Sequence, residues 1–134
     1  MSKAEPPPRS KGVVLIVDDD PIVLAVTAER LEGLGYTVHT REEALGTSQW
    51  ISTNQPDIIL LDVNMPALSG TELALLIRRR QTTKKAVIVL YSSLPESELQ
   101  ALARTTGAIG VVHKTSDEKQ FIEEFERVVV RRKS

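Results

Sequence analysis

Four short apolar runs, separated by segments with a helical pattern, most constrain what this chain can fold into. They are near-continuous and rich in valine and isoleucine: Val13–Val17, Ile58–Leu61, Ala86–Tyr91 and Ile109–Val112. Such runs are typical of strands that are buried on both faces of a parallel sheet. A fifth run, Tyr36–Thr40, is more mixed in polarity, which predicts an exposed edge strand.

Helical patterns occupy the segments that follow these runs. The predicted helices are Pro21–Leu34, Glu42–Thr53, Gly70–Gln81, Glu96–Thr106 and Asp117–Arg131. Pro21 suits a first helical position, and Asp19 or Asp20 could cap that helix. Five strand–helix units in succession predict an α/β fold with a single doubly wound, five-stranded parallel sheet of order 2-1-3-4-5 and five helices.

The length and composition predict one domain with short tails. The chain has 134 residues, and we expect a flexible tail at 1–11, one domain at 12–131 and a C-terminal tail at 132–134. Cysteine is absent, which excludes disulfides, thiolate metal sites and cysteine catalysis. The net charge of −1 does not suggest direct nucleic-acid binding. No N-terminal signal or membrane-length apolar run is present, so we expect no membrane contact and a cytoplasmic location.

Polar residues follow four of the five predicted strands. Asp18 and Asp19 follow the first strand, Asp62 the third, Ser92 the fourth and Lys114 the fifth. Because the carboxyl ends of parallel strands meet at one edge, we expect these side chains to converge there. Taken singly, each has a plainer interpretation: an aspartate after a strand is often only a helix cap, and a serine or lysine is often unremarkable.

The combination of these groups indicates phosphoryl transfer. Two carboxylates 4 Å apart repel each other by about 4 kcal/mol at an effective dielectric of 20. Lys114 offsets part of the charge, and a hard divalent cation such as Mg²⁺ (or Mn²⁺) would offset the rest. A metal ion beside a carboxylate, a lysine and a hydroxyl is the arrangement that phosphoryl transfer onto the carboxylate requires.

Three sequence features are typical of one protein family: Val-Asp-Asp at 17–19, Leu-Asp-Val-Asn-Met-Pro at 61–66, and Gly70. With the intervals from Asp62 to Ser92 and on to Lys114, they resemble the receiver domain of two-component response regulators. The resemblance spans about Gly12 to Arg131 and implies a flavodoxin-like fold. It implies that a sensor histidine kinase or phosphotransfer protein phosphorylates Asp62, which switches a surface that binds a downstream protein of unknown identity.

The same resemblance implies a role for each matching residue. The implied metal ligands are oxygen donors: Asp18, Asp19, Asp62 and the backbone carbonyl of Asn64. Lys114 would pair with Asp62 and then with the phosphoryl oxygen, and the hydroxyl of Ser92 would move to bond the phosphoryl group. The Asn64 side chain and Ser93 would tune the lifetime of the phosphorylated state.

Two positions depart from the family pattern. Val111 stands where receiver domains usually have a tyrosine or phenylalanine that moves with the switch hydroxyl. Thr115 stands where a proline usually follows the lysine. Val111 therefore bears on how phosphorylation is read out, and Thr115 on how Lys114 is held.

Two alternative functions are compatible with parts of the sequence. Asp18-Asp19-Asp20 resembles the nucleophile motif of haloacid-dehalogenase-like phosphatases, but that interpretation leaves Asp62 unexplained. The other alternative is a receiver-like interaction module that works without phosphorylation, which Val111 and Thr115 favour. The complete acceptor set favours the phosphorylated switch, with self-phosphorylation and autodephosphorylation but no metabolic enzyme activity.

Overall fold

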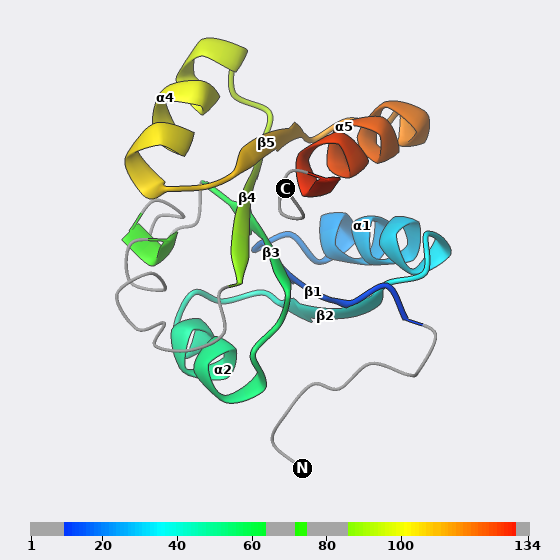
Figure 1. Cartoon of the computed structure of the whole chain (residues 1–134), viewed down its shortest axis with the longest axis vertical. Coiled ribbons are helices and arrows are strands. Elements are labelled where there is room, and N and C mark those ends of the chain that lie inside the picture. Colours follow the sequence, from blue (N-terminus) through cyan, green and yellow to red (C-terminus); the bar gives the residue numbers. More distant parts are fainter. Residues whose placement is uncertain (1–9, 64–71, 75–85, 131–134) are drawn as a thin grey trace.

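The computed structural model describes residues 10–63, 72–74 and 86–130 (Figure 1). Several predictions lie outside these residues: Asn64, Gly70, and all of the predicted helix Gly70–Gln81 except Glu72–Ala74, which is helical. The same holds for positions 1–9 of the predicted N-terminal tail and for the predicted tail at 132–134.

The five predicted strands are present, and they form one parallel sheet of order β2-β1-β3-β4-β5. The strands are β1 (Val13–Val17), β2 (Thr37–Arg41), β3 (Ile58–Asp62), β4 (Val87–Ser92) and β5 (Gly110–His113). The predicted fold class and strand order are therefore confirmed. The register places Val17 opposite Leu61 and Asp62 opposite Tyr91, so the strands end at a common edge.

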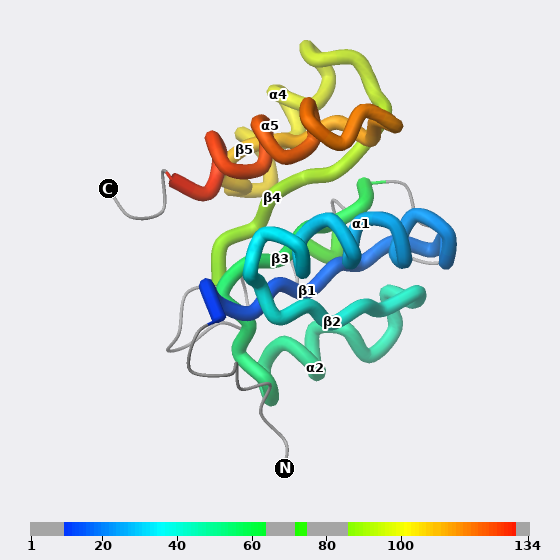
Figure 2. The backbone as a smooth tube through the Cα atoms, turned by 90° about the vertical axis from the view of Figure 1, so that its right-hand side faces the viewer, coloured from blue at the N-terminus to red at the C-terminus, as the bar shows by residue number. Residues whose placement is uncertain are grey.

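Within the part of the chain that the structure describes, four helices cover the two faces of the sheet: α1 (Pro21–Gly33), α2 (Thr47–Asn54), α4 (Glu96–Thr106) and α5 (Glu118–Val130). One core cluster joins the sheet to α1 and α5, which lie side by side in both views (Figures 1 and 2). A second cluster joins the opposite face to α2, α4 and the Glu72–Ala74 segment. Because helices cover both faces, all five residues of β1 and all five of β3 are buried.

The first helix begins as its sequence predicts. Asp20, one of the two candidate caps, accepts hydrogen bonds from the backbone N–H groups of Ile22 at 2.9 Å and Val23 at 3.4 Å. Pro21 occupies the first helical turn. Asp19, the other candidate, does not cap α1, which leaves its carboxylate available for another role.

The predicted start of the second helix was wrong. The pattern predicted a helix from Glu42, but α2 begins at Thr47 because Gly46 has a left-handed backbone with φ of 81°. The segment before it is held by side-chain hydrogen bonds instead. Arg41 donates to the Thr47 hydroxyl at 2.8 Å and to the Leu45 carbonyl at 2.9 Å.

The predicted edge strand is confirmed as an edge and is shifted by one residue to Thr37–Arg41. Its residues are mostly half-buried, in contrast to the buried strands at the centre. Within residues 10–63, 72–74 and 86–130, no helix has the length and apolar character needed to cross a membrane.

Candidate functional site

The polar residues predicted to converge lie at one edge of the sheet. Asp18 and Asp19 follow β1, Asp62 ends β3, Ser92 ends β4 and Lys114 follows β5. The neighbouring strand ends are tied together by a hydrogen bond from the Lys114 backbone N–H to the Ser92 carbonyl at 2.9 Å. The parallel topology thus assembles groups that are far apart in sequence.

Three aspartates form an acidic cluster at this edge. Asp18, Asp19 and Asp62 each offer a carboxylate oxygen, and these oxygens lie within 4.8 Å of one another. Asp18 is fully buried and Asp62 is 2% exposed, whereas Asp19 is exposed. Asp18 is held in place because its Oδ1 accepts the backbone N–H of Asp20 at 2.9 Å.

Lys114 contacts both buried carboxylates. Its Nζ lies 2.7 Å from Oδ2 of Asp18 and 3.2 Å from Oδ1 of Asp62. Desolvation lowers the pKa of Lys114, but the hydrogen bond to Asp18 and the charges of Asp62 and Asp18 outweigh it and raise the pKa above its ordinary value. The ammonium is therefore charged at neutral pH. The sequence predicted the partner Asp62, and the shorter contact to Asp18 was not predicted.

The charges of the site fit a divalent cation. Three carboxylates face one ammonium, so negative charge is in excess when all four groups are ionised. Oδ2 of Asp18 is buried, and the Lys114 ammonium at 2.7 Å is its close partner among the described residues. A cluster of carboxylate oxygens open to solvent at Asp19 matches the ligands that Mg²⁺ prefers. The carbonyl of Asn64, a predicted ligand, lies outside the described residues.

Ser92 and Ser93 differ in exposure. Ser92 is 2% exposed, and its Oγ accepts the backbone N–H of Leu94 at 3.0 Å. That contact leaves the hydroxyl proton of Ser92 able to donate to another acceptor. Ser93 is exposed and lies next to the strand end.

Tyr91 contributes to the site in a way that the sequence did not reveal. The Lys114 Nζ lies 5.5 Å from the centre of the Tyr91 ring, within reach of a cation–π contact. The Tyr91 hydroxyl is 3.0 Å from the hydroxyl of Thr27 on α1, and burial raises the pKa of Tyr91. The position of Thr27 could have indicated such a contact. It is a polar residue on the buried face of α1, between Leu24 and Leu31, and a buried hydroxyl needs a hydrogen-bond partner.

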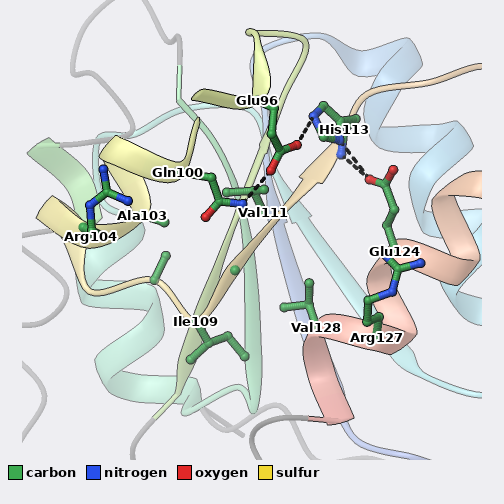
Figure 3. A pocket seen from close by; sticks show the side chains of 12 residues that line it. Glu96, Gln100, Ala103, Arg104, Ile109, Val111, His113, Glu124, Arg127 and Val128 are labelled. Carbon is green, nitrogen blue, oxygen red and sulfur yellow. Dashed lines mark hydrogen bonds and ion pairs between the residues drawn. The ribbon is translucent and has the colours of Figure 1, made fainter. Parts of the chain in front are cut away.

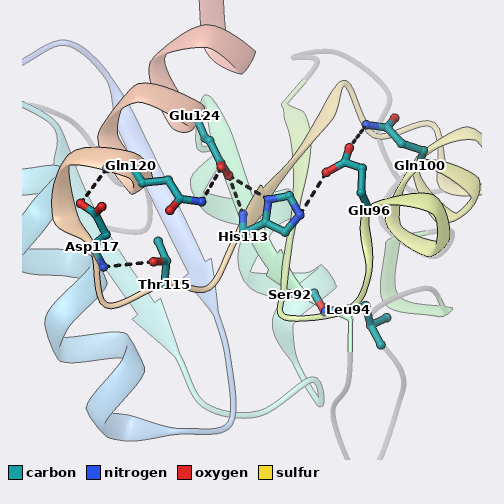
Figure 4. Close-up of polar contacts among 9 residues, drawn as sticks. All are labelled: Ser92, Leu94, Glu96, Gln100, His113, Thr115, Asp117, Gln120 and Glu124. Atoms are coloured by element: carbon teal, nitrogen blue, oxygen red, sulfur yellow. Dashed lines mark hydrogen bonds and ion pairs between the residues drawn. The ribbon is translucent and has the colours of Figure 1, made fainter.

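A second polar group lies on the face formed by α4, β5 and α5. The ring of His113 lies 3.1 Å from Glu96 on α4 through Nε2 and 3.1 Å from Glu124 on α5 through Nδ1 (Figure 4). Glu124 also accepts the His113 backbone N–H at 2.9 Å. These contacts join two helices to the last strand, which indicates a structural role for His113.

Val111 lies beneath this polar group. It is 9% exposed and belongs to the core cluster shared with α4. A groove of about 370 Å³ runs between α4 and α5 above it, lined by Gln100, Val111, Arg127 and Val128 among others (Figure 3). A valine leaves this groove open where a larger aromatic side chain would fill more of it.

The relatives that match this chain are larger proteins. A sensor histidine kinase of Salmonella typhimurium, RcsC, is 36% identical over 90 residues, which is 67% of this chain and 10% of that protein. The DNA-binding transcriptional regulator NtrC of Escherichia coli is 27% identical over 119 residues, which is 89% of this chain and 25% of that protein. The chain thus spans about a tenth of RcsC and a quarter of NtrC.

The fold and the family model agree. The chemotaxis response regulator CheY4 of Vibrio cholerae has a TM-score of 0.78 and 25% identity, and the match covers 87% of this chain and 97% of that one. The family model described as "Response regulator receiver domain" matches residues 14–126. Receiver domains are signalling modules of two-component systems and not metabolic enzymes. The chain belongs to the response regulator receiver domain family.

Proposed function

We propose that Asp62 accepts a phosphoryl group from a phosphohistidine of a sensor histidine kinase or phosphotransfer protein. The observation that carries this proposal is the surroundings of Asp62. It is a nearly buried carboxylate with an ammonium at 3.2 Å and two further carboxylates in the same cluster. A carboxylate in such surroundings, beside a cation, suits the role of nucleophile toward phosphorus.

A magnesium or manganese ion would be held by Asp18, Asp19 and Asp62, with the carbonyl of Asn64 as a further ligand. When bound, it supplies positive charge that offsets the clustered carboxylates and the incoming phosphoryl oxygens. The donor set supports this assignment because it consists of oxygen atoms, includes two buried carboxylates, and has three carboxylates facing one ammonium.

The covalent step exchanges one bond to phosphorus for another. A carboxylate oxygen of Asp62 forms a bond to phosphorus while the bond from phosphorus to the histidine nitrogen breaks. The bonding electrons leave with the ring nitrogen, and a proton carried on the other nitrogen of the phosphohistidine ring makes the departing imidazole neutral. The product on Asp62 is an acyl phosphate, and attack by water later returns the carboxylate and releases inorganic phosphate.

Lys114 and Ser92 would stabilise the phosphorylated state. The Lys114 ammonium already lies between Asp18 and Asp62, so a phosphoryl oxygen on Asp62 can replace one of its carboxylate partners. The Ser92 hydroxyl has a free proton to donate toward the same group. Asn64 and Ser93 would adjust the access of water and hence the lifetime of the acyl phosphate.

The partner that delivers the phosphoryl group would dock on α1. Ile22 is 73% exposed and Val26 is 44% exposed on this helix. Both line a groove of about 410 Å³ that is also lined by Tyr91, Lys114 and Thr115. An apolar surface that leads to the reacting edge suits a helical partner that presents a histidine.

Mass spectrometry of the intact protein tests this function. We expect incubation with phosphoramidate and Mg²⁺ to add the mass of one phosphoryl group, and we expect Asp62→Asn or removal of divalent ions to prevent the gain. Asp20→Asn is the matched control, because it makes the same change at an exposed aspartate that caps α1 and lies outside the acidic cluster. A gain of mass that persists in Asp62→Asn would overturn the assignment of the acceptor.

A second function has one observation in its favour. Val111 fills less of the groove between α4 and α5 than an aromatic residue would, which suits an interaction module that works without phosphorylation. Affinity for a downstream protein that is the same for the unmodified chain, the phosphorylated chain and Asp62→Ala would favour this alternative. If treatment with phosphoramidate changes the affinity of the parent chain and leaves that of Asp62→Ala unchanged, the interaction module that works without phosphorylation is excluded.

A further inference from the structure

The loop between β5 and α5, residues 114–117, carries Lys114 and is held at both ends. The Lys114 backbone N–H donates to the Ser92 carbonyl at 2.9 Å. At the other end, the Asp117 side chain caps α5 by accepting the Gln120 N–H at 3.1 Å, and Thr115 Oγ1 accepts the Asp117 N–H at 3.0 Å (Figure 4). The two carbonyls between these ends lie outside any strand or helix.

Arg30 of α1 binds both of these carbonyls. Its Nη1 donates to the Thr115 carbonyl at 3.0 Å, and its Nη2 donates to the Ser116 carbonyl at 3.3 Å. A guanidinium is planar and rigid, so two contacts from one fork fix the spacing and direction of both acceptors. Hydrogen bonds from a charged donor are also stronger than neutral ones.

Arg30 is itself fixed by its surroundings. The side chain is half-buried, and its guanidinium carbon lies 5.4 Å from the centre of the Phe121 ring on α5. A cation in the last turn of a helix can act on the helix dipole alone, and that role needs no partner on another element. Here the side chain reaches the loop and α5, so it joins three parts of the fold.

We propose that Arg30 is a positioning residue that, by fixing the two carbonyls after Lys114, holds that ammonium between Asp18 and Asp62 for the reaction. The inference rests on the proposed function of Asp62. Thr115 has no ring, so it restricts the loop backbone less than a proline at that position would. The contacts from Arg30 therefore supply a restraint that the sequence of the loop lacks. In this chain, the restraint comes from a side chain of α1.

Substitutions at Arg30 test the proposal through the rate of phosphorylation. Arg30→Met keeps an apolar stem and removes both donors, and it should slow phosphorylation by phosphoramidate at saturating Mg²⁺ by roughly tenfold. Arg30→Lys keeps the charge without the fork and should give an intermediate rate. The affinity for Mg²⁺, measured by calorimetry without donor, should stay within about twofold because the strand ends of β1 and β3, and not Arg30, position the three carboxylates.

Two comparisons separate positioning from a general loss of structure. In a Lys114→Met background, Arg30→Met should cause no further slowing, because its effect passes through Lys114. Arg104→Met, which removes an exposed arginine of α4, should leave the rate unchanged. All rates are measured well below the unfolding temperature of each variant. Equal slowing by Arg30→Met in both backgrounds would overturn the proposal.

A third measurement does not depend on phosphorylation. The NMR signal of the Lys114 ε-methylene reports the environment of the ammonium in the protein without donor. Arg30→Met should shift this signal toward that of an exposed lysine, and an unchanged signal would overturn the proposal. If the parent chain gains no phosphoryl group, the proposed function of Asp62 fails, and the NMR result by itself decides whether Arg30 positions Lys114.

Discussion

Two neighbouring residues at the end of β5, His113 and Lys114, each lie between two carboxylates, but in surroundings that differ in exposure. The Lys114 ammonium contacts Asp18 at 2.7 Å and Asp62 at 3.2 Å, and the side chains of these aspartates are 0% and 3% exposed. The partners come from the ends of two central strands. Water therefore screens this group of charges only weakly.

The carboxylates around His113 come from helices and are more exposed. The Glu96 side chain is 57% exposed and that of Glu124 is 17% exposed, while the His113 ring is 27% exposed. Contacts between exposed charged groups contribute little to stability, because water screens them and the side chains lose freedom. Only the Glu124 side of this arrangement is partly protected from solvent.

The comparison shows that the role of a nitrogen group between two carboxylates depends on how deeply those carboxylates are buried. At Lys114 the buried charges interact strongly and respond to any new charge placed on Asp62, which suits a chemical site. At His113 the contacts join α4 and α5 to the last strand, which suits a structural role. Four predictions test this difference between the Lys114 site and the His113 contacts, in order of decreasing effect.

The largest effect is expected at Lys114, the cation whose carboxylate partners are buried. Lys114→Met should slow phosphorylation of Asp62 by phosphoramidate by on the order of a hundredfold, because no ammonium then faces the phosphoryl oxygens. His113→Gln, a change in the adjacent residue, should alter the rate by less than about twofold. Stopped reactions weighed by mass spectrometry give both rates, and equal losses in the two variants would end the contrast.

The next effect concerns the exposed carboxylate of the cluster. Asp19→Asn should weaken Mg²⁺ binding by roughly tenfold, because one charged ligand is lost. Without divalent ions it should raise the free energy of unfolding by about 0.5 to 1 kcal/mol, because it relieves repulsion from the two buried carboxylates. Calorimetry and urea unfolding measure the two quantities.

Asp20→Asn is the matched control for this prediction. It removes a charge from the adjacent residue and keeps a side-chain oxygen that can cap α1. We expect little change in Mg²⁺ affinity for Asp20→Asn. A loss of affinity as large as that of Asp19→Asn would mean that overall negative charge matters more than the ligand geometry of the cluster.

A smaller effect, dependent on pH, is expected at the His113 contacts. Burial raises the pKa of Glu124, but hydrogen bonds from the His113 backbone, Gln120 and the His113 side chain outweigh it and lower the pKa below its ordinary value of 4.5. The carboxylate therefore contributes stability that is present above about pH 4.5 and is lost as pH falls through the lowered pKa.

Glu124→Gln should accordingly reduce the free energy of unfolding by about 1 kcal/mol at pH 7. The difference from the parent chain should shrink as the pH falls below 4.5, because the parent then also carries a neutral side chain. Urea unfolding at a series of pH values measures this. A difference that stays constant down to pH 3 would contradict the assigned charge.

The smallest effect is expected at the most exposed carboxylate. Glu96→Gln should change the free energy of unfolding by less than about 0.5 kcal/mol, because its contact with His113 lies mostly in solvent. The same unfolding series compares it with Glu124→Gln. A loss at Glu96 as large as that at Glu124 would show that exposure does not set the strength of these contacts.

Much of this arrangement follows from local sequence patterns. Buried strands such as β1 and β3 have near-continuous apolar runs, and the polar residue after each run marks the strand end. The candidate site residues Asp18, Asp62 and Lys114 could be found because a parallel sheet brings all such ends to one edge. The start of α2 could not be found, because the left-handed backbone at Gly46 is not visible in the helical pattern.

Contacts between side chains of distant elements were beyond prediction. Nothing near Lys114 in the chain indicates that its shorter contact is with Asp18, and nothing near Arg30 indicates that it binds the carbonyl of Thr115. Likewise, no residue near His113 in the sequence indicates that its ring contacts Glu124. These contacts depend on how far each helix lies along the sheet and on which rotamers fit there.

The order of apolar and polar residues was enough to establish strands, helices, topology and the edge at which the reactive groups gather, because periodicity and burial act over a few neighbouring positions. The choice of partner for each charge, and the degree to which water reaches it, arose when helices packed on the sheet. The distances between charged groups and the extent to which water screens them depend on how helices and sheet pack together, so they cannot be inferred from any one segment of the sequence.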